Sequence, residues 1–179
     1  MKYIDAFNHF FPARLWERML TLEEAGQNIG KRMRAIPSIY DLDVRFRIMD
    51  EFGDYRQILS LGMPPLESLG TPEFVEELAR LGNDGMADLV ARYPDRFAGF
   101  IASLPMNSPN AAAEAERAFR ECGANGLQIH SNINGAPLDD PSFFPACSSP
   151  GRDGSIPACR GWPPSRKPER SSDHRGARR

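Results

Sequence analysis

The chain has 179 residues, of which 41% are hydrophobic and 26% are charged. These proportions are typical of a globular protein and exclude a collagen, a coiled-coil rod and a wholly disordered chain. The net charge of −2 predicts no general attraction to nucleic acid or to an anionic membrane. No apolar run approaches the roughly 18 residues of a membrane span, and the N-terminus has no apolar signal core, so we expect a cytoplasmic protein. Three cysteines without metal-type spacing predict reduced thiols.

Charge is unevenly distributed along the chain. Residues 146–179 carry eight basic and three acidic residues, whereas residues 1–145 carry 14 basic and 21 acidic residues. The C-terminal segment also holds 15 proline, glycine or serine residues and a single branched aliphatic residue, Ile156. It cannot bury enough apolar surface to offset the entropy of ordering its backbone. We therefore expect one partial domain over 1–145 and a disordered basic tail over 146–179.

Three explanations of this tail stay open. The composition changes directly after the segment 143–145 (FFP), within an expected helix, and GC-rich coding sequence that is read out of frame yields such an excess of Arg, Pro and Gly. A genuine basic tail and a divergent structured end are the alternatives. The basic side chains and Trp162 could hold nucleic acid through phosphate contacts and stacking. We favour a merely solvated tail and expect no nucleic-acid partner.

Residues 1–145 alternate between strand-like and helix-like patterns. Apolar runs bounded by turn residues predict strands at 3–7, 55–61, 97–104 and 126–132. Apolar residues at helical spacing predict helices at 13–26, 41–53, 71–93 and 108–123, with a loop at 26–40. Strands separated by helices pair in parallel, so this order predicts an α/β fold, either doubly wound or a barrel. No glycine-rich phosphate-binding loop accompanies these strands.

Local signals place the helix ends and faces. Asp41 and Thr71 are typical N-cap residues, Gly123 is a natural helix stop, and Asn134-Gly135 predicts a turn. The second helix carries apolar residues on one face at Val44, Ile48 and Phe52. The third helix has its predicted buried stripe at Phe74, Leu78, Leu81, Met86, Leu89, Val90 and Tyr93.

The functional site of a parallel α/β fold lies at the carboxyl ends of its strands. Side-chain alternation gives two sets that face the functional side of the sheet or a barrel interior: Asp5, Phe7 and His9 on the first strand, and Gln128, His130 and Asn132 on the fourth. The two histidines could bind a metal or move protons. Two isolated, hydrogen-bonded histidines are the alternative, because two ligands do not close a metal site.

Two segments resemble the amidohydrolase superfamily. Residues 4–12 (IDAFNHFFP) are similar to its first-strand motif Asp-x-His-x-His, and residues 123–141 (GANGLQIHSNINGAPLDDP) are similar to its fourth strand and the following turn. More narrowly, the N-terminal half of the chain resembles the amidohydrolase-related branch, which includes aminocarboxymuconate-semialdehyde decarboxylase and the resorcylate-type decarboxylases.

This resemblance implies a (β/α)8 TIM barrel with a divalent metal, zinc ahead of manganese, at its mouth. It implies hydrolysis of a C–N or C–O bond, or non-oxidative loss of CO2, in a small organic or aromatic acid or a cyclic amide or ester. By position it makes His9 a metal ligand and His130 with Asn132 a wall of the substrate pocket. It assigns no catalytic residue.

The chain departs from the family pattern in three ways. Phe7 stands where the family has the first histidine of the pair, the remaining ligands belong to strands five to eight, and a complete barrel needs about 250 residues. We therefore expect the first four βα units of a barrel, a weakened metal site and impaired activity. We also expect self-association through the open sheet edge. A non-catalytic pseudoenzyme, or an interaction module with a nucleic-acid-binding tail, is the alternative.

Overall fold

The computed structural model describes residues 3–24 and 31–143, so the predicted tail at 146–179 lies outside the described residues. The strands are β1 (Tyr3–Asp5), β2 (Tyr55–Leu59), β3 (Phe97–Ser103), β4 (Gly126–Gln128), β5 (Asn132–Ile133) and β6 (Ala136–Pro137). The α-helices are α1 (Ala13–Glu24), α2 (Lys31–Arg34), α3 (Leu42–Asp50), α4 (Pro72–Arg92) and α5 (Ala111–Arg117), which continues as a π-helical turn over Ala118–Cys122. Short 3₁₀ helices are η1 (Pro37–Ile39), η2 (Leu66–Ser68) and η4 (Pro141–Phe143). Within these ranges no helix is long and apolar enough to cross a membrane.

Four strands form one parallel sheet in the order β1-β2-β3-β4. Tyr3 pairs with Tyr55 and Ile101 pairs with Gly126, so strands that are neighbours along the chain are neighbours in the sheet. Helices connect the strands, and each returns the chain to the same end of the sheet. The carboxyl ends of all four strands therefore gather at one edge. This order confirms the predicted first four βα units of a barrel.

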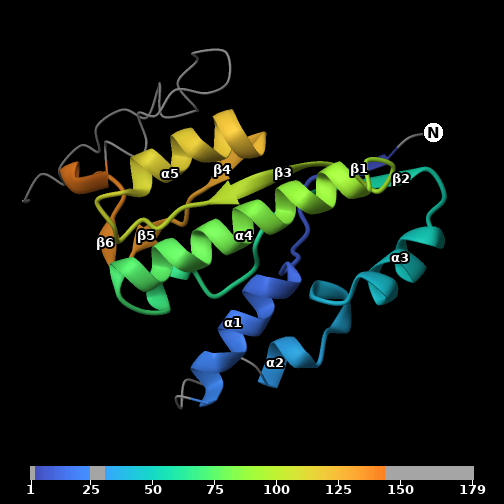
Figure 1. Cartoon of the computed structure of the whole chain (residues 1–179), viewed down its shortest axis with the longest axis horizontal. Coiled ribbons are helices and arrows are strands. Elements are labelled where there is room, and N and C mark those ends of the chain that lie inside the picture. Colours follow the sequence, from blue (N-terminus) through green and yellow to red (C-terminus); the bar gives the residue numbers. More distant parts are fainter. Residues whose placement is uncertain (1–2, 25–30, 144–179) are drawn as a thin grey trace, which may run out of the picture.

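The largest buried cluster lies between this sheet and its helices. Figure 1 shows the long α4 lying along β3, with α1 crossing near it. The largest fully buried side chains of the cluster include Phe10, Phe11, Leu15, Met19, Leu59, Leu61, Leu78, Met86, Phe97 and Phe100. Each such side chain contributes about 1.5–3 kcal/mol through removal of its apolar surface from water. This core holds the strand ends rigidly in place.

Helix α3 turns a different face inward from the one that its apolar residues indicate. Arg45 and Met49 are buried, whereas Ile48 and Phe52 are 43% and 59% exposed. The helix packs this way because Arg45 has hydrogen-bond partners at the strand ends, described below. Apolar periodicity contains no information about such partners. The loop predicted at 26–40 also contains the short helices α2 and η1.

Helix α4 begins and packs largely as predicted. Thr71 caps its N-terminus, as Asp41 caps that of α3. The predicted stripe is confirmed as buried at Leu78, Met86 and Leu89, and its other members, Phe74, Leu81, Val90 and Tyr93, are half-buried and pack against the core. The buried face also contains Val75, Ala79, Gly82 and Asn83. An asparagine in the middle of a buried face needs polar partners, and β3 and α5 supply them.

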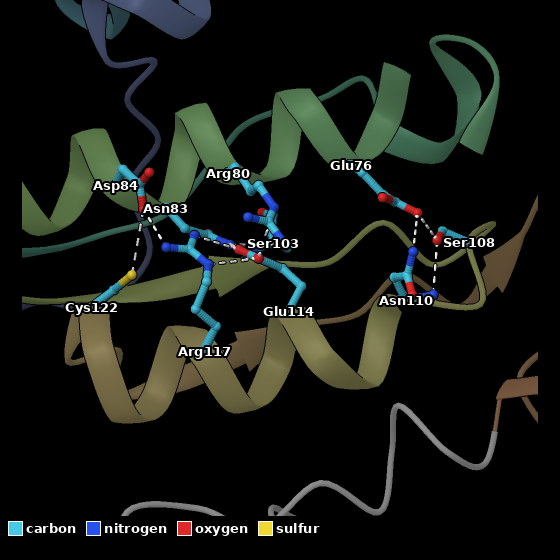
Figure 2. Close-up of polar contacts among 10 residues, drawn as sticks. All are labelled: Glu76, Arg80, Asn83, Asp84, Ser103, Ser108, Asn110, Glu114, Arg117 and Cys122. Carbon is cyan, nitrogen blue, oxygen red and sulfur yellow. Dashed lines mark hydrogen bonds and ion pairs between the residues drawn. The ribbon is translucent and has the colours of Figure 1, made fainter. Parts of the chain in front are cut away.

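Asn83 joins α4 to β3 and α5, as Figure 2 shows. Its side-chain amide donates to the backbone oxygen of Ser103 at 3.0 Å and to Oε1 of Glu114 at 2.8 Å, and its Oδ1 accepts from the backbone nitrogen of Ser103 at 3.0 Å. The buried Glu114 carboxylate is paired with Arg117, which also donates to Asp84. These contacts fix the carboxyl end of β3, because Ser103 is its last residue.

Strand β4 ends earlier than predicted. It stops at Gln128, and Asn132 lies instead in β5, which forms an antiparallel hairpin with β6. The turn at Asn134-Gly135 is confirmed: both residues have positive φ, 50° and 88°, as a two-residue hairpin turn requires. The predicted strand over 126–132 is therefore wrong beyond Gln128, because this turn chemistry pairs Asn132 with the hairpin.

Candidate functional site

The carboxyl ends of β2, β3 and β4 enclose a narrow pocket. Its lining residues are Leu61, Gly62, Pro64, Leu66, Glu67, Ser103, Leu104, Met106, Gln128 and His130. Most of them are apolar, and the polar groups come from the loop after β2, from the end of β3 and from the end of β4. Parallel α/β folds bind their ligands at this edge. The pocket is therefore the candidate functional site.

Gly62 joins this pocket to the end of β1. It lines the pocket, and a Cβ atom placed on it would lie 3.3 Å from Cβ of His9 and 3.2 Å from Cζ of Phe11. Such distances are tighter than nearly all real Cβ contacts, so a larger residue would displace its neighbours. His9 therefore lies directly behind one wall of the pocket.

The imidazole of His9 is oriented by Ser60. The hydroxyl of Ser60 donates its single proton to the backbone oxygen of Asn8 at 2.6 Å, and it lies 3.1 Å from Nδ1 of His9. Because that proton is already used, the hydroxyl accepts a hydrogen bond from Nδ1–H. The neutral ring then carries its free lone pair on Nε2. A histidine that binds a metal through one nitrogen commonly donates its other N–H in this way.

Arg45 holds the backbone around His9. Its buried guanidinium donates to the backbone oxygens of His9 and Ser38, both at 2.9 Å, and to Oδ1 of Asn8. Burial lowers the pKa of Arg45 to about 10, so the group keeps its charge at neutral pH. A charged guanidinium that donates to several acceptors at once is a rigid anchor. The segment that carries His9 is therefore fixed from α3 as well as from β2.

A series of hydrogen bonds between side chains connects Arg45 to the first strand. Nε of Arg45 donates to Oε1 of Gln57 at 2.7 Å, Nε2 of Gln57 donates to the hydroxyl of Tyr55 at 3.0 Å, and that hydroxyl donates to Asp5 at 2.8 Å. Burial raises the pKa of Tyr55, so its proton stays available for this bond. Asp5, predicted to face the functional side, is thus the distant counter-charge of Arg45.

The residues of the described ranges do not by themselves fit a metal ion. Phe7 is 85% exposed, and its ring lies edge-on to that of His9, with 5.3 Å between the ring centres. Phenylalanine has no donor atom, and those ranges contain no group of three His, Cys, Asp or Glu residues able to hold a metal. His9 is one donor where a zinc site needs three or four.

Gln128, His130 and Asn132, which were predicted to share one face, lie in two different places. Gln128 and His130 line the pocket. Asn132 is exposed and accepts a hydrogen bond from the backbone nitrogen of Gly135 at 3.0 Å, within the β5–β6 hairpin. The structure therefore brings His130 to the pocket edge, with His9 behind the Gly62 wall, and places Asn132 in the neighbouring hairpin.

The sequence profile of the amidohydrolase family matches residues 4–162. The chain belongs to the amidohydrolase family. This amidohydrolase chain is 41% identical over 104 residues to the gamma-resorcylate decarboxylase of Polaromonas sp. strain JS666, an alignment that covers 58% of this chain and 30% of the relative. It is 38% identical over 118 residues to the 2-amino-3-carboxymuconate-6-semialdehyde decarboxylase of Dictyostelium discoideum, covering 65% of this chain and 33% of the relative.

Solved structures of decarboxylases share the fold. The 5-carboxyvanillate decarboxylase of Sphingomonas paucimobilis matches with a TM-score of 0.68 and 27% identity, over 83% of this chain and 48% of that one. The dihydroxybenzoic acid decarboxylase of Polaromonas sp. JS666, solved with bound manganese and the inhibitor 2-nitroresorcinol, matches with a TM-score of 0.64 and 30% identity, over 82% and 45%. This amidohydrolase chain thus spans less than half the length of these structures.

Three residues around the site are absent from the sequence-based predictions. Arg45 lies in an amphipathic helix, where a charged residue is usually taken as solvent-facing. Ser60 follows an apolar strand and carries no motif. Glu67 is the residue that the sequence could have indicated, because it is an acidic residue in the otherwise apolar and small segment 64–69 (PPLESL).

Proposed function

We propose that this chain carries one half of the active site of a metal-dependent, non-oxidative decarboxylase that acts on small hydroxylated aromatic acids. The observation that carries the proposal is the position of His9: Ser60 contacts its Nδ1, and the residue lies behind the Gly62 wall of a pocket at the carboxyl ends of the strands. The decarboxylase names of several relatives support the reaction class. Hydrolysis of an amide or ester by the same site is the less supported form of the proposal.

The proposed reaction breaks the bond between the ring carbon and the carboxylate. The electron pair stays on the ring carbon, a proton takes the place of CO2, and neither an oxidant nor a reductant is required. Leu61, Leu104 and Met106 form apolar parts of the pocket wall. His130 is proposed to contact the substrate from the end of β4, and Asn132 to support the pocket through its hairpin.

His9 is proposed as the one metal ligand that the described residues contribute. Its partners would come from a part of the barrel beyond β4. A divalent ion bound there would polarise the substrate's oxygen atoms. Zinc is our first expectation, and the manganese of the dihydroxybenzoic acid decarboxylase structure supports a second. A cytoplasmic location and a homo-oligomer remain predictions.

A non-catalytic relative is the second candidate, and Phe7 favours it. This residue removes one donor from the first-strand motif and places an apolar ring against His9. Replacing Phe7 with His separates the two candidates. The decarboxylase proposal expects Phe7→His to raise affinity for Mn²⁺ at least about tenfold, since a second ligand is added at the same strand end. An unchanged affinity would fit the non-catalytic relative, or a metal site that lacks the ligands of the later strands.

The metal proposal is tested by paramagnetic broadening. Mn²⁺ is titrated into the ¹⁵N-labelled chain, and the signals of His9, Ser60 and Gly62 are expected to broaden first. His9→Ala should abolish this selectivity, whereas His130→Ala should retain it. Uniform broadening, or broadening that survives His9→Ala, would remove His9 from the metal site.

The reaction is tested by completing the barrel. The chain is co-expressed with the C-terminal half of the Polaromonas gamma-resorcylate decarboxylase, and ¹⁴CO2 release from carboxyl-labelled 2,6-dihydroxybenzoate is measured with Mn²⁺. Release that requires both halves and is lost in His9→Ala is the expected result. A folded complex that binds Mn²⁺ without releasing CO2 would contradict decarboxylation.

A further inference from the structure

A groove separate from the pocket at the strand ends lies between α1, α4 and the segment from η1 to α3. It has a volume of about 260 Å³ and shares no lining residue with that pocket. Its lining comes from the start of α1, from one side of α4 and from Tyr40 and Leu42. Sites for drug-sized ligands have roughly 300–1,000 Å³, so this groove suits a smaller molecule, of about amino-acid size.

The floor of the groove is apolar. Leu81, Gly85 and Leu89 follow one another at intervals of four residues, so they share one face of α4. A Cβ atom on Gly85 would lie 2.4 Å from Cβ of Pro12, so the glycine is what lets the start of α1 come this close to α4. Phe10, which is 1% exposed, also lines the groove. The floor therefore offers an apolar surface to a ligand.

The wall that Tyr40 forms is fixed in advance. Its ring stacks on that of Trp16, with 4.5 Å between the ring centres and 3° between the ring planes, and its hydroxyl donates to the backbone oxygen of Arg34 at 3.0 Å. The backbone nitrogen of Phe11 donates to the backbone oxygen of Ile39 at 2.7 Å, which joins the segment after β1 to η1. A groove that is already formed loses little conformational entropy when a ligand binds.

Charges of both signs lie beside the apolar floor. Asp88 and Arg92 are four residues apart on α4, and Arg14 lies in the first turn of α1. An acidic residue four positions before a basic one can pair with it on a helix, yet within the described parts of the chain none of these three side chains has an ion pair or a hydrogen bond. Asp84 also lines the groove, but it is paired with Arg117 at 2.7 Å. One anionic and two cationic groups are therefore available to a ligand.

We propose that this groove binds an α-amino acid with an apolar side chain. The side chain of the ligand lies on the floor, its ammonium group binds the Asp88 carboxylate, and its carboxylate binds Arg92 and Arg14. An ammonium and a carboxylate on one carbon atom match opposite charges that are one helical turn apart. A simple carboxylic acid is repelled by Asp88, and a simple amine is repelled by the two arginines. The site does not depend on the proposed function, because none of its residues lines the pocket at the strand ends.

Three ligands with the same apolar body test the site. L-phenylalanine carries both charges, 3-phenylpropanoate lacks the ammonium group, and phenethylamine lacks the carboxylate. Their binding to the full chain is measured by calorimetry and by NMR of the ¹⁵N-labelled chain. We expect L-phenylalanine to bind at least about tenfold more tightly than either analogue, because each hydrogen bond between charged groups adds to its affinity. The amide signals of Gly85 and Asp88 should shift, whereas those of Gly62 and His130 should not.

Two exposed variants identify which group binds which charge. Asp88→Asn should weaken L-phenylalanine at least about fivefold and should not weaken 3-phenylpropanoate, because that analogue has no ammonium group. Arg92→Gln should weaken both carboxylate ligands and should not weaken phenethylamine. Glu73→Gln, an exposed change near the start of α4, should affect none of the three.

The site would be overturned if L-phenylalanine did not bind, if it bound no better than both analogues, or if the shifted signals centred on Gly62. An unchanged preference in both Asp88→Asn and Arg92→Gln would also overturn it. An equal loss of all three ligands in Asp88→Asn would contradict the ammonium contact, and urea unfolding of that variant shows whether its fold is intact.

Discussion

The hydroxyl of Ser60 lies 3.1 Å from Nδ1 of His9 and gives its own proton to the backbone of the preceding residue. One side chain at the end of β2 thus decides which nitrogen of a histidine after β1 is free. The two residues are 51 positions apart in the chain, and parallel strand pairing brings them together. The chemistry of the first-strand motif therefore depends on the second strand.

Removing the Ser60 hydroxyl should release the His9 ring. Ser60→Ala deletes one acceptor and one donor, so we expect a mixture of both neutral tautomers in ¹⁵N NMR spectra. The free energy of unfolding should fall by about 1 kcal/mol. Ser60→Thr retains the hydroxyl and is the control. A single, unchanged tautomer in Ser60→Ala would show that another contact sets the ring.

Arg45 should be among the most sensitive positions of the fold. Arg45→Met removes a buried cation and leaves the backbone oxygens of His9 and Ser38 without their donor, so unfolding free energy should fall by about 3 kcal/mol or more in urea titrations. Arg47→Met, on the exposed side of the same helix, should change it by no more than about 0.5 kcal/mol. Equal effects of the two changes would contradict the anchoring role of Arg45.

Asn83 should matter for stability more than its neighbours on α4. Asn83→Ala leaves both backbone groups of Ser103 and one oxygen of Glu114 without this partner, and we expect a loss of about 3 kcal/mol. Asp88→Ala, an exposed change one turn further along, should be nearly neutral. Thermal unfolding followed by circular dichroism compares them, and a cost below about 1 kcal/mol for Asn83→Ala would contradict the network.

Cys122 should react slowly and with a strong pH dependence. Burial raises the pKa of its thiol, the Arg117 charge lowers it and the neighbouring Asp84 carboxylate raises it, and the net value is about 11. The thiol is therefore protonated at neutral pH, and alkylation by iodoacetamide should accelerate about tenfold per pH unit until about pH 11. Mass spectrometry of peptides separates this residue from the other two cysteines.

Asp84→Asn is the matched variant for Cys122. Loss of the negative charge should lower the pKa of the thiol and speed alkylation at pH 8, whereas removal of the Arg117 charge should slow it. An alkylation rate at pH 8 equal to that of the urea-unfolded chain would contradict the raised pKa.

The exposed side of β1 should mediate self-association. Within the described residues β1 pairs only with β2, and Ile4 is 51% exposed on this strand. Unpaired strand edges favour contact with other chains. Sedimentation velocity should show concentration-dependent association that Ile4→Lys weakens and Ile36→Lys, at a similarly exposed residue in another part of the molecule, does not. A stable monomer at all concentrations would contradict this prediction.

The sequence by itself determined the order of strands and helices, the caps at Asp41 and Thr71, the turn at Asn134-Gly135 and the first-strand motif around His9. These features depend on apolar periodicity and on the backbone preferences of single residues, which are local properties. They were sufficient to predict an α/β fold with a parallel sheet and the edge at which its site lies, whereas the half-barrel followed from the resemblance to the amidohydrolase superfamily. The same local patterns predicted a fourth strand that is too long, because the alternation of side chains continues past Gln128 into the β5–β6 hairpin.

Only the tertiary structure decided which polar groups meet at that edge. The contacts of His9 with Ser60, of Arg45 with His9 and of Asn134 with Glu67 join residues 51, 36 and 67 positions apart. Each depends on strand register and on the way the loops fold over the sheet, and no local pattern contains either. The buried Arg45 and the buried Glu67 look like ordinary surface charges until their neighbours are known, because burial is a property of the packed molecule rather than of the residue.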